Sequence, residues 1–308
     1  MSLGQRLKSG LGRQLRKRAL TRYVLAQLTR LPKSSKGVVL SRIDKALYLI
    51  EQSGRGLEIG PSHNPIAPKS LGFDVDILDH ASAEELRQKY RHHAVDIERI
   101  EDVDFVWQGQ PLDELIGQHQ CYDYIIASHV IEHTPDLVSF LQQCARLLKP
   151  DGVLSLVIPD KRYCFDYLRW PSSTGDVLDA YLQQRQRHSP GVVFEHMANA
   201  VKSDGQIAWA QGIMGDLEYV HGFEEAVAAW NQAQQTTEYQ DVHQWRFTPA
   251  SFRLVLHDLN RMGLTELREA CRFDTQGCEF FISLSKGATP ESNRMHLATD
   301  MMQEMRPA

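Results

Sequence analysis

Between residues 50 and 160, strand-like and helix-like segments alternate, and this alternation restricts the fold more than any other feature of the sequence. Alternation of this kind is typical of a parallel sheet flanked by helices. The last two strand candidates are almost continuously apolar, as expected for central strands that are buried on both faces. The five strand candidates are residues 56–60, 73–79, 103–107, 122–128 and 153–159.

A clear helix is predicted between the last two of these strands. Thr134 is the expected N-cap, Pro135 suits the first helical position, and Asp136 favours the positive end of the helix dipole. Apolar side chains recur along one face, and the Pro-Asp-Gly sequence at 150–152 ends the segment in a turn. A second helix, residues 81–92, is expected after the second strand.

The alternation stops after Asp160 and resumes near residue 246. Residues 161–245 are rich in Gln, His, Trp and Tyr, with short helical patches and no clear strand. A helix that opens at Thr248 follows, with an apolar face. Two strand candidates come after it, residues 264–273 and 279–284, and the residues between them predict a hairpin turn at 274–277.

These patterns together predict an α/β fold. We expect a doubly wound sheet of seven strands, mostly parallel, with a C-terminal antiparallel hairpin and a mainly helical insertion. The expected parts are a basic N-terminal helix (1–36), the first part of the core (37–160), an insertion that caps the substrate site (161–245), the completion of the core sheet (246–287) and a flexible tail (288–308).

The composition is that of a globular protein that folds without disulfides. Of the 308 residues, 42% are hydrophobic and 24% are charged, which allows a sizeable core. The five cysteines are scattered and form no C-x-x-C pair, so we expect neither a disulfide framework nor a structural zinc site. This cysteine usage fits a reducing cytoplasm. No apolar run approaches the length of a membrane-spanning helix.

Residues 1–36 carry ten positive charges and no acid. Leucines recur every four residues from Leu3 to Leu15, which predicts a helix with an apolar stripe and cationic flanks. Three interpretations are open: contact with an anionic membrane surface through residues 1–30, packing on the main domain, or contact with nucleic acid. Because the chain's net charge of −5 includes these ten positive charges, the other residues sum to −15, and nucleic acid is not expected.

Two predicted strand ends indicate a cofactor that contains adenosine. Gly60 ends the first strand, where a glycine lets the backbone approach a ligand closely, and Glu58 lies just inside that end. Asp79 ends the second strand, 19 residues after Gly60, which is the offset of a carboxylate that binds ribose hydroxyls. Either feature alone also fits a turn or a helix cap, but the pair within an alternating pattern predicts a ribose site.

Together with these residues, four segments resemble the motifs of class I S-adenosylmethionine-dependent methyltransferases, in the family's order. They are LEIGPS, DILDH, YDYIIASHVIEHTPDL and LLKPDGVLSLVIPD. The resemblance covers roughly residues 50–160 and 247–286 and implies a Rossmann-like sheet with S-adenosylmethionine as cofactor. Gly60 is followed by Pro-Ser-His-Asn-Pro instead of a glycine-rich loop, which disfavours a dinucleotide and is compatible with a cofactor that has no phosphate.

The resemblance also implies cofactor contacts, and it implies no metal. The implied contacts are Glu58, Gly60 and Pro61 at the methionine end, Asp79 at the ribose, Gln108 near the adenine, and Ser128 and His129 beside the methionine. Gln108 stands where the family usually has an acid, so its role differs from the family pattern.

Methyl transfer to a hydroxyl needs a group that removes the hydroxyl proton. The sulfonium methyl is already a strong electrophile, so the protein mainly aligns the attack and excludes water. His133 and His129 follow the fourth strand and are the histidines best placed to act as the base. Packing or capping roles for these histidines remain open.

The same segment, from His129 to His133, matches H-x-x-E-H, a zinc-peptidase pattern. That chemistry requires both histidines on one face of a helix, with a third ligand downstream. His129 directly follows a predicted strand, and Pro135 would disrupt a helix that already ran through the motif. A zinc hydrolase is therefore the least favoured function.

Candidate acceptor contacts lie where the fifth strand ends and where the insertion rejoins the core. Lys161 and Arg162 suit phosphate or carboxylate groups, and Asp160 suits sugar hydroxyls. A surface turn with local ion pairs explains these three residues equally well. In the insertion, His243 is the preferred contact because its segment leads directly back to the core. The tryptophans and tyrosines of the insertion suit either pyranose faces or a small helical core.

The segments SHVIEHTPDL, IPDKRYCFDYLR and WRFTPASF resemble bacterial methyltransferases associated with cell-surface polysaccharide synthesis. This resemblance implies O-methylation of a sugar or glycan intermediate in the cytoplasm and, through the basic helix, at the inner face of the plasma membrane. The alternatives are a methyltransferase for another small molecule or an amine, a non-catalytic binding protein with the same fold, and the zinc hydrolase.

Overall fold

The structure is a computed structural model that describes residues 40–289 and 293–306 of the chain. The basic helix predicted for residues 1–36 lies outside the described residues. From Arg42 onward the chain forms one compact unit built on a central sheet. Among the residues that the structure describes, no helix is long and apolar enough to cross a membrane.

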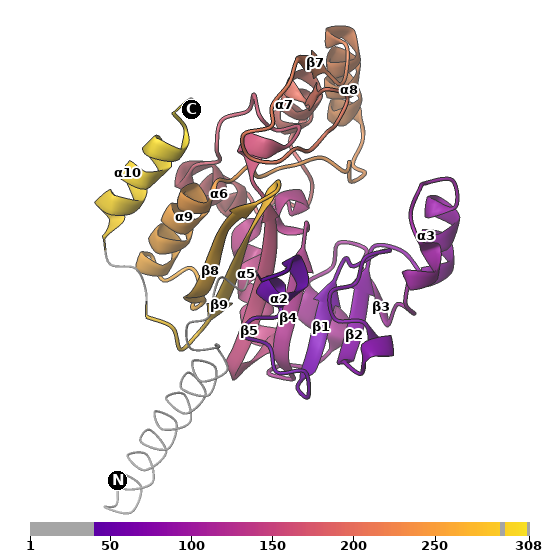
Figure 1. Cartoon of the computed structure of the whole chain (residues 1–308), viewed down its shortest axis with the longest axis vertical. Coiled ribbons are helices and arrows are strands. Elements are labelled where there is room, and N and C mark those ends of the chain that lie inside the picture. The colour runs from indigo at the N-terminus through magenta and orange to yellow at the C-terminus, as the bar shows by residue number, and fades with distance from the viewer. Residues whose placement is uncertain (1–39, 290–292, 307–308) are drawn as a thin grey trace, which may run out of the picture. The chain divides into compact units, whose positions relative to one another are not determined.

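Seven strands form the central sheet, and the five that come first in the sequence run parallel to one another (Figure 1). Across the sheet they are β3 (Phe105–Val106), β2 (Asp74–Asp79), β1 (Arg55–Ile59), β4 (Tyr122–Ser128), β5 (Leu148–Pro159), β9 (Glu279–Ser285) and β8 (Arg268–Gln276). β9 is antiparallel to both of its neighbours. The predicted fold class is confirmed. The winding reverses between β1 and β4, the point at which such sheets bind ligands.

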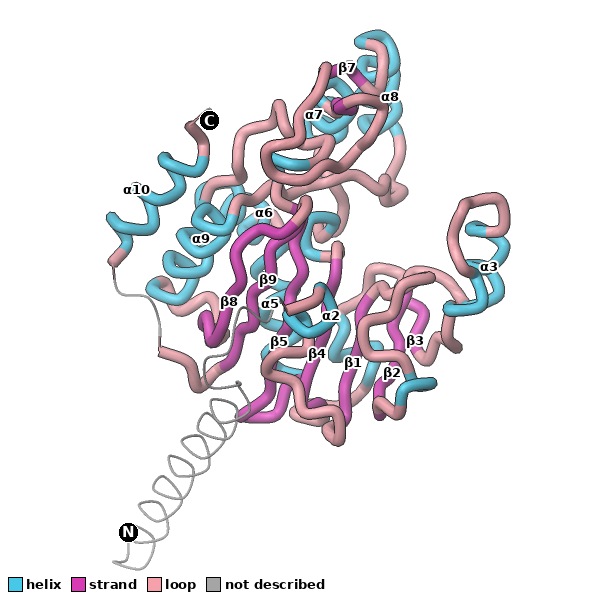
Figure 2. The backbone as a smooth tube through the Cα atoms, viewed as in Figure 1, coloured by secondary structure: helices cyan, strands magenta, loops and turns pink. Residues whose placement is uncertain are grey.

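Helices and loops cover both faces of the sheet (Figure 2). The helices of this core are α2 (Arg42–Ala46), α3 (Ala83–Tyr90), α4 (Leu112–Ile116), α5 (Leu137–Leu147) and α9 (Pro249–Arg261), with short 3-10 turns η1 (Lys69–Leu71) and η2 (Ile97–Arg99). Ile125 of β4 packs in the same apolar cluster as α4, α5 and α9. Tyr124 and Ile126 point to the opposite face, where α2 and the segment after β1 cover them. This alternation explains why β4 has almost no polar residue in its middle.

The helix after β4 begins later than predicted. Asp136, rather than Thr134, is the N-cap of α5, and its Oδ1 accepts a hydrogen bond of 3.0 Å from the Ser139 backbone N–H. The Thr134 hydroxyl donates to the Ile131 carbonyl and belongs to a separate 3-10 turn, η3 (Ile131–His133). The loop between β4 and α5 therefore contains its own short turn, which carries the H-x-x-E-H segment.

The predicted hairpin near the C-terminus is present, but its turn lies later. β8 continues to Gln276, so the turn consists of Gly277 and Cys278. Gly277 has a φ of 65°, a conformation that a glycine adopts without steric cost and that a two-residue hairpin turn requires.

The insertion forms three helices and a small sheet. Its elements are η4 (Lys161–Tyr163), α6 (Thr174–Leu182), α7 (Pro190–Asn199), β6 (Val201–Ser203), β7 (Leu217–Tyr219) and α8 (Phe223–Gln235). Figure 1 shows α7, β7 and α8 beyond the edge of the main sheet from which β5 leaves, whereas α6 packs against α5 and α9 of the core. The mainly helical character agrees with the prediction, but the antiparallel pair of β6 and β7 had no sequence signal. Val193, Ala233 and Val242 form a separate small core between its segments.

The C-terminal region differs from the expected flexible tail. Residues Arg294–Glu304 form a helix, α10, which packs on α9. Leu297 is buried, and the Arg294 guanidinium lies 2.7 Å from the Asp258 carboxylate. The Glu304 carboxylate accepts a hydrogen bond of 3.0 Å from the Ala250 backbone N–H at the start of α9. These contacts fix a polar segment that has little apolar periodicity, which is why its sequence did not predict a helix.

Candidate active site

The chain turns sharply where β4 ends, at the carboxyl edge of the parallel strands. His129 follows the strand with a φ of 54°, a left-handed conformation that is uncommon for a residue with a side chain. Its Nε2 lies 2.8 Å from Oε2 of Glu279, the first residue of β9. Arg42 of α2 also binds Glu279, with its Nε 2.7 Å from Oε1, and donates to the Ser128 hydroxyl. Burial raises the pKa of Glu279, but the hydrogen bonds from His129 and Arg42 lower it more.

Glu132 in η3 is a buried acid without a hydrogen-bond partner. Glu132 is 1% exposed, and neither of its carboxylate oxygens accepts a hydrogen bond from a described residue. The nearest charged group is the His129 imidazole, whose Nδ1 lies 3.5 Å from Oε1 of Glu132. Buried carboxylates are normally paired or bound to a metal ion, so this side chain is a candidate functional residue.

His133 follows Glu132 and is half-buried. Its Nδ1 lies 2.8 Å from Oδ1 of Asp241, which is exposed, and its backbone carbonyl accepts a hydrogen bond from the Tyr239 hydroxyl. Burial lowers the pKa of His133, but Asp241 and Glu132 raise it more, so the net shift is upward. This imidazole therefore sits in a negatively charged surrounding.

The last segment of the insertion is hydrogen-bonded to η3. The backbone N–H groups of Gln244 and Trp245 both donate to the Glu132 carbonyl, at 2.7 and 3.1 Å. The Trp245 indole donates to the Thr134 carbonyl at 2.7 Å. This docking brings His243 beside His133, with the ring centroids 4.6 Å apart.

His243 is held by an acid at the other end of the insertion. Its Nδ1 lies 2.5 Å from Oδ2 of Asp166, and Oδ1 of the same acid accepts 2.7 Å from Nη1 of Arg169. Nη1 of Arg169 also donates to the His243 carbonyl. Burial raises the pKa of Asp166, but His243 and Arg169 lower it more. Sequence analysis missed Asp166 and Arg169; the i,i+3 spacing of the acid and the arginine was the available signal.

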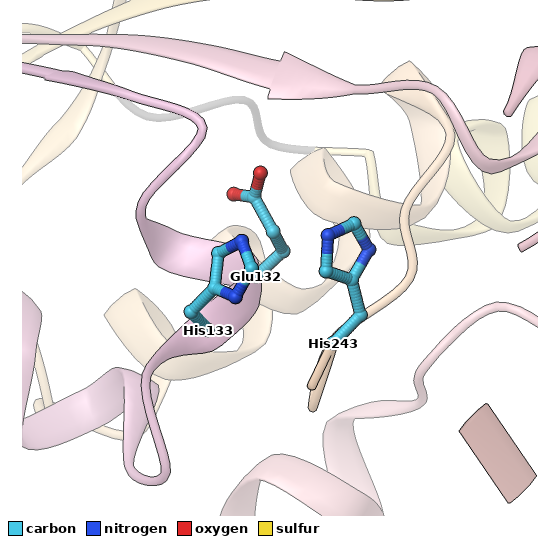
Figure 3. Close-up of side chains that lie close together, drawn as sticks. All are labelled: Glu132, His133 and His243. Carbon is cyan, nitrogen blue, oxygen red and sulfur yellow. The ribbon is translucent and has the colours of Figure 1, made fainter. Parts of the chain in front are cut away.

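Glu132, His133 and His243 thus form one polar group, which Figure 3 shows from η3 on one side and the end of the insertion on the other. One ligand atom from each lies within 4.8 Å of the other two. Two further imidazoles lie nearby, His188 and His196, and burial lowers their pKa to about 4 and about 3. The group can accept a proton from a substrate or bind a cation.

Three of the residues proposed for the cofactor, Gly60, Pro61 and Asp79, lie at the ends of β1 and β2. Gly60 has a φ of 64°, and a Cβ placed there would meet Cγ2 of Val130 at 3.1 Å. Asp79 is buried at the end of β2, where Oδ2 accepts from the Ser62 backbone N–H and Oδ1 from that of His80, at 2.9 and 2.8 Å. Asp79 therefore fixes the loop that follows Gly60 and Pro61.

Glu58 is buried and is engaged by the same loop. Its two carboxylate oxygens accept hydrogen bonds from the backbone N–H groups of Ile66 and Ala67, at 2.6 and 3.0 Å. Burial raises the pKa of Glu58 to about 7, although these two hydrogen bonds lower it. The structure thus gives Glu58 a role in positioning the loop between β1 and β2.

Gln108, the last of the residues proposed for the cofactor, is exposed after β3. Its backbone N–H donates to Oε1 of Gln110, and the indole of Trp107 donates to the Gln110 carbonyl. These bonds fix a compact turn, which leaves the Gln108 side chain on the surface.

Two of the three charged residues after β5 bind each other instead of facing solvent. Asp160 is fully buried and accepts three hydrogen bonds from Arg162, at 3.0, 2.9 and 2.6 Å, and one from Thr275. Lys161 is also buried, its Nζ donates to the Tyr167 carbonyl, and burial lowers its pKa to about 8. These residues therefore form an interior polar cluster that joins the core to the insertion, and not the surface turn that was the alternative to an acceptor contact.

Comparison with known proteins identifies a family. A family model described as "Methyltransferase domain" matches residues 33–260. Among curated proteins, the chain is 30% identical over 92 residues to the mitochondrial ubiquinone biosynthesis O-methyltransferase of Rattus norvegicus, and 29% identical over 101 residues to the ubiquinone biosynthesis O-methyltransferase of Rhodopseudomonas palustris. These matches cover 30% and 33% of this chain, and only 26% and 35% of the two relatives.

The chain also has low similarity to several solved methyltransferase structures. The chain is similar to the CcbJ methyltransferase of Streptomyces caelestis, with 13% identity, a TM-score of 0.40, and coverage of 82% of this chain and 99% of that one. A methyltransferase of Methanosarcina mazei has 14% identity, a TM-score of 0.41, and coverage of 81% and 99%. The family match spans both sides of the insertion and includes the strand ends and η3 described above. The chain therefore belongs to the methyltransferase domain family, and it has the fold of class I S-adenosylmethionine-dependent methyltransferases.

Proposed function

We propose that this protein transfers a methyl group from S-adenosylmethionine to a hydroxyl oxygen of a sugar or glycan intermediate. The observation that carries the proposal is the group of Glu132, His133 and His243 beside the carboxyl ends of β1 and β4. It places proton-accepting side chains next to the region where a class I sheet binds its cofactor.

The proposed donor site consists of Gly60, Pro61, Asp79, Ser128 and His129, with Gln108 at its far side. The donor set suits a nucleoside without phosphate, because it offers a carboxylate for the ribose and no run of glycine N–H groups for a pyrophosphate. Asp79 is 2% exposed and its Oδ2 accepts a hydrogen bond from the Ser62 N–H, so a ribose can reach this carboxylate only if the loop after Gly60 shifts. Ser62 has a φ of 49°, an uncommon conformation for a non-glycine residue.

When bound, the cofactor supplies a methyl group on a positively charged sulfur. The acceptor oxygen forms a bond to that carbon, the carbon–sulfur bond breaks, and its electron pair stays on sulfur as a neutral thioether. The hydroxyl proton leaves to the polar group, where His133 and His129 are the proposed acceptors. His129 already contacts Glu279 through Nε2, so His133 is the better candidate.

An oxygen acceptor, and a sugar in particular, is supported by three observations. The relatives whose names specify a reaction are O-methyltransferases, although they match less than half of their own length. The amino-acid sequences of the segments around η3, η4 and the start of α9 resemble those of methyltransferases of polysaccharide synthesis. Within the insertion, Trp170 is 78% exposed and offers an aromatic face of the kind that binds pyranose rings.

His243 is the proposed acceptor contact among the four residues first considered. Asp160 and Arg162 are hydrogen-bonded to each other, and Lys161 donates to a backbone carbonyl. These three side chains would therefore have to break internal hydrogen bonds to bind an acceptor. His243 lies beside His133 and needs no such rearrangement.

Two measurements test this function. Calorimetry with S-adenosylhomocysteine shows whether the protein binds the product that the cofactor leaves behind. A protein that does not bind it would contradict the proposal. Mass spectrometry of surface glycans from a strain without this gene should show the loss of one methylene mass per acceptor. Glycans of unchanged mass would contradict the sugar acceptor, and transfer of labelled methyl groups to amines alone would contradict the oxygen chemistry.

We also propose that residues 1–30 bind an anionic membrane surface, which would bring the enzyme to lipid-linked acceptors. The support is their sequence alone: cationic side chains around a leucine stripe. Flotation with vesicles that contain anionic lipid should recover the full chain and lose the chain without residues 1–30. Equal recovery of both would contradict the membrane contact.

A further inference from the structure

We propose that Glu132, His133 and His243 bind a divalent first-row transition-metal ion, which in turn binds the hydroxyl oxygen of the acceptor. The metal site follows from the geometry of these three residues. Its part in methyl transfer rests on the function proposed above. The sequence predicted no metal, and the H-x-x-E-H pattern suggested a different set of ligands.

The first argument is the unsatisfied carboxylate. Glu132 is 1% exposed, both of its oxygens lack a hydrogen bond among the described residues, and one of them lies within 4.8 Å of a ring nitrogen of each of the two imidazoles. A buried charge without a partner costs several kcal/mol in an apolar surrounding, so such groups are retained where a ligand balances them. The side chains that face Glu132 are imidazoles. No arginine or lysine among the described residues lies within ion-pair distance of Glu132 to balance its charge in place of a metal ion.

The second argument is the orientation of the two imidazoles. Nδ1 of His243 faces Oδ2 of Asp166 at 2.5 Å, and Nδ1 of His133 faces Oδ1 of Asp241 at 2.8 Å. In each ring the other nitrogen, Nε2, is left for a ligand. Carboxylates that hold the distal nitrogen of a histidine are the usual support of metal-binding histidines, because they fix the ring and increase its basicity. His243 has this support as a hydrogen bond, and Nδ1 of His133 lies at ion-pair distance from Asp241 without hydrogen-bond geometry among the described residues.

The third argument is local charge. The Asp166 carboxylate is balanced by the Arg169 guanidinium at 2.7 Å. Glu132 and Asp241 have no arginine or lysine within ion-pair distance among the described residues. The region around the two free imidazole nitrogens is therefore negative and favours a cation.

The ligand chemistry selects the kind of ion. Two imidazoles with one carboxylate suit zinc, iron or manganese better than magnesium or calcium, which prefer oxygen ligands alone. Three protein ligands leave coordination positions open for a substrate oxygen. His129 does not belong to this set: its Nε2 binds Glu279, and its Nδ1 lies 3.5 Å from Oε1 of Glu132 without forming a hydrogen bond.

With an ion in place, the acceptor proton need not go to His133. A hydroxyl bound to a divalent cation has a lowered pKa and releases its proton to solvent. The oxygen lone pair then forms the bond to the methyl carbon, and the electrons of the carbon–sulfur bond remain on sulfur. His133 acts in this scheme through the metal, and the insertion supplies the third ligand.

Zinc binding by the full chain tests the site directly. After treatment with EDTA and desalting, calorimetry with Zn²⁺ should show one saturable site per chain. E132Q and H243Q should each weaken it by more than the roughly 10–100-fold that the loss of a supporting residue costs. D166N keeps the ligand set and removes the support of His243, so it should fall within that 10–100-fold range.

H188Q is the matched control, because His188 is a buried imidazole of the same region outside the ligand set. Its zinc affinity should equal that of the unmodified chain. The proposal is overturned if zinc does not bind saturably, if E132Q and H243Q bind it unchanged, or if H188Q loses it equally. Binding of S-adenosylhomocysteine by every variant confirms that the fold and the cofactor site survive the substitutions.

The two proposals fail in different ways. A chain that binds zinc but not S-adenosylhomocysteine contradicts the proposed function and leaves the metal site standing. A chain that binds S-adenosylhomocysteine and, after EDTA treatment, transfers methyl groups at the full rate overturns the role of the metal in the reaction. Loss of transfer on chelation, with recovery on addition of Zn²⁺ or Mn²⁺ and not Mg²⁺, is the expected result.

Discussion

Nδ1 of His243 lies 2.5 Å from Oδ2 of Asp166, and this contact joins the two ends of the insertion. Asp166 follows η4, where the chain leaves the core, and His243 stands where the chain returns to it. The insertion is thus closed at its base by a buried contact between a carboxylate and an imidazole, which also orients this imidazole in the candidate active site. The stability of the insertion and the geometry of the site depend on the same residues.

Arg169→Met should destabilise the protein. Arg169 is 3% exposed and donates to both Asp166 and the His243 carbonyl, so its loss leaves a buried carboxylate with less compensation. Breaking such a pair costs about 3–5 kcal/mol of the free energy of unfolding. Urea unfolding measures the change, with exposed Arg91→Met as the control. Equal midpoints for the two variants would contradict a buried structural pair.

Asp79→Ala should weaken binding of S-adenosylhomocysteine. Each charge-assisted hydrogen bond to the ribose contributes about 1.5–3 kcal/mol, so affinity should fall roughly ten- to hundredfold. Calorimetry measures this, and Asp74→Ala, an exposed acid at the start of the same strand, is the matched control. If both variants bind the ligand as the unmodified chain does, Asp79 is not the ribose carboxylate.

Gly60→Ala should reduce cofactor affinity beyond its cost in stability. Gly60 and Gly117 have φ values of 64° and 68°, so alanine is strained by roughly 1–2 kcal/mol at both positions. Only at Gly60 would the new Cβ contact another side chain, that of Val130 at 3.1 Å, beside the proposed donor site. The midpoint of thermal unfolding should fall by a similar amount in both variants. Calorimetry should show weaker S-adenosylhomocysteine binding in Gly60→Ala alone. Equal affinities would place Gly60 outside the cofactor site.

Glu58 should make the protein less stable as the pH rises toward neutrality. Burial raises its pKa from 4.5 to about 7, so between these values the folded state binds more protons than the unfolded state, and stability falls with rising pH. The slope approaches about 1.4 kcal/mol per pH unit. Urea unfolding from pH 5 to 8 should show this slope in the unmodified chain and its absence in Glu58→Gln, with exposed Glu84→Gln as the control. Parallel profiles for the unmodified chain and Glu58→Gln would contradict the shift.

His133→Ala should lower kcat about 10²–10⁴-fold while it leaves S-adenosylhomocysteine affinity nearly intact, because His133 acts on the acceptor, whether it removes the acceptor proton itself or holds the metal ion. His119→Ala, an exposed histidine after α4, provides the control. Steady-state kinetics with labelled methyl donor measures the effect. Turnover that stays unchanged in His133→Ala would remove this residue from the mechanism.

The sequence by itself determined the sheet and most of its helices. Continuous apolar runs in β4 and β5, and helical periodicity in α5 and α9, are local signals that specify which face of each element is buried. The strand-end residues Gly60 and Asp79 were found in the same way, because a glycine and an acid at fixed spacing follow from the geometry of a single strand–loop–strand unit.

Only the tertiary structure decided which polar side chains meet. The Trp245 indole and the Thr134 carbonyl are 111 positions apart, and their hydrogen bond sets His243 beside Glu132 and His133. No periodicity encodes such a contact, because it depends on how the whole insertion packs against one turn. For the same reason the sequence suggested that Asp160 and Arg162 were open to a ligand, whereas folding turns them toward each other in the interior, where an unpaired charge would be costly.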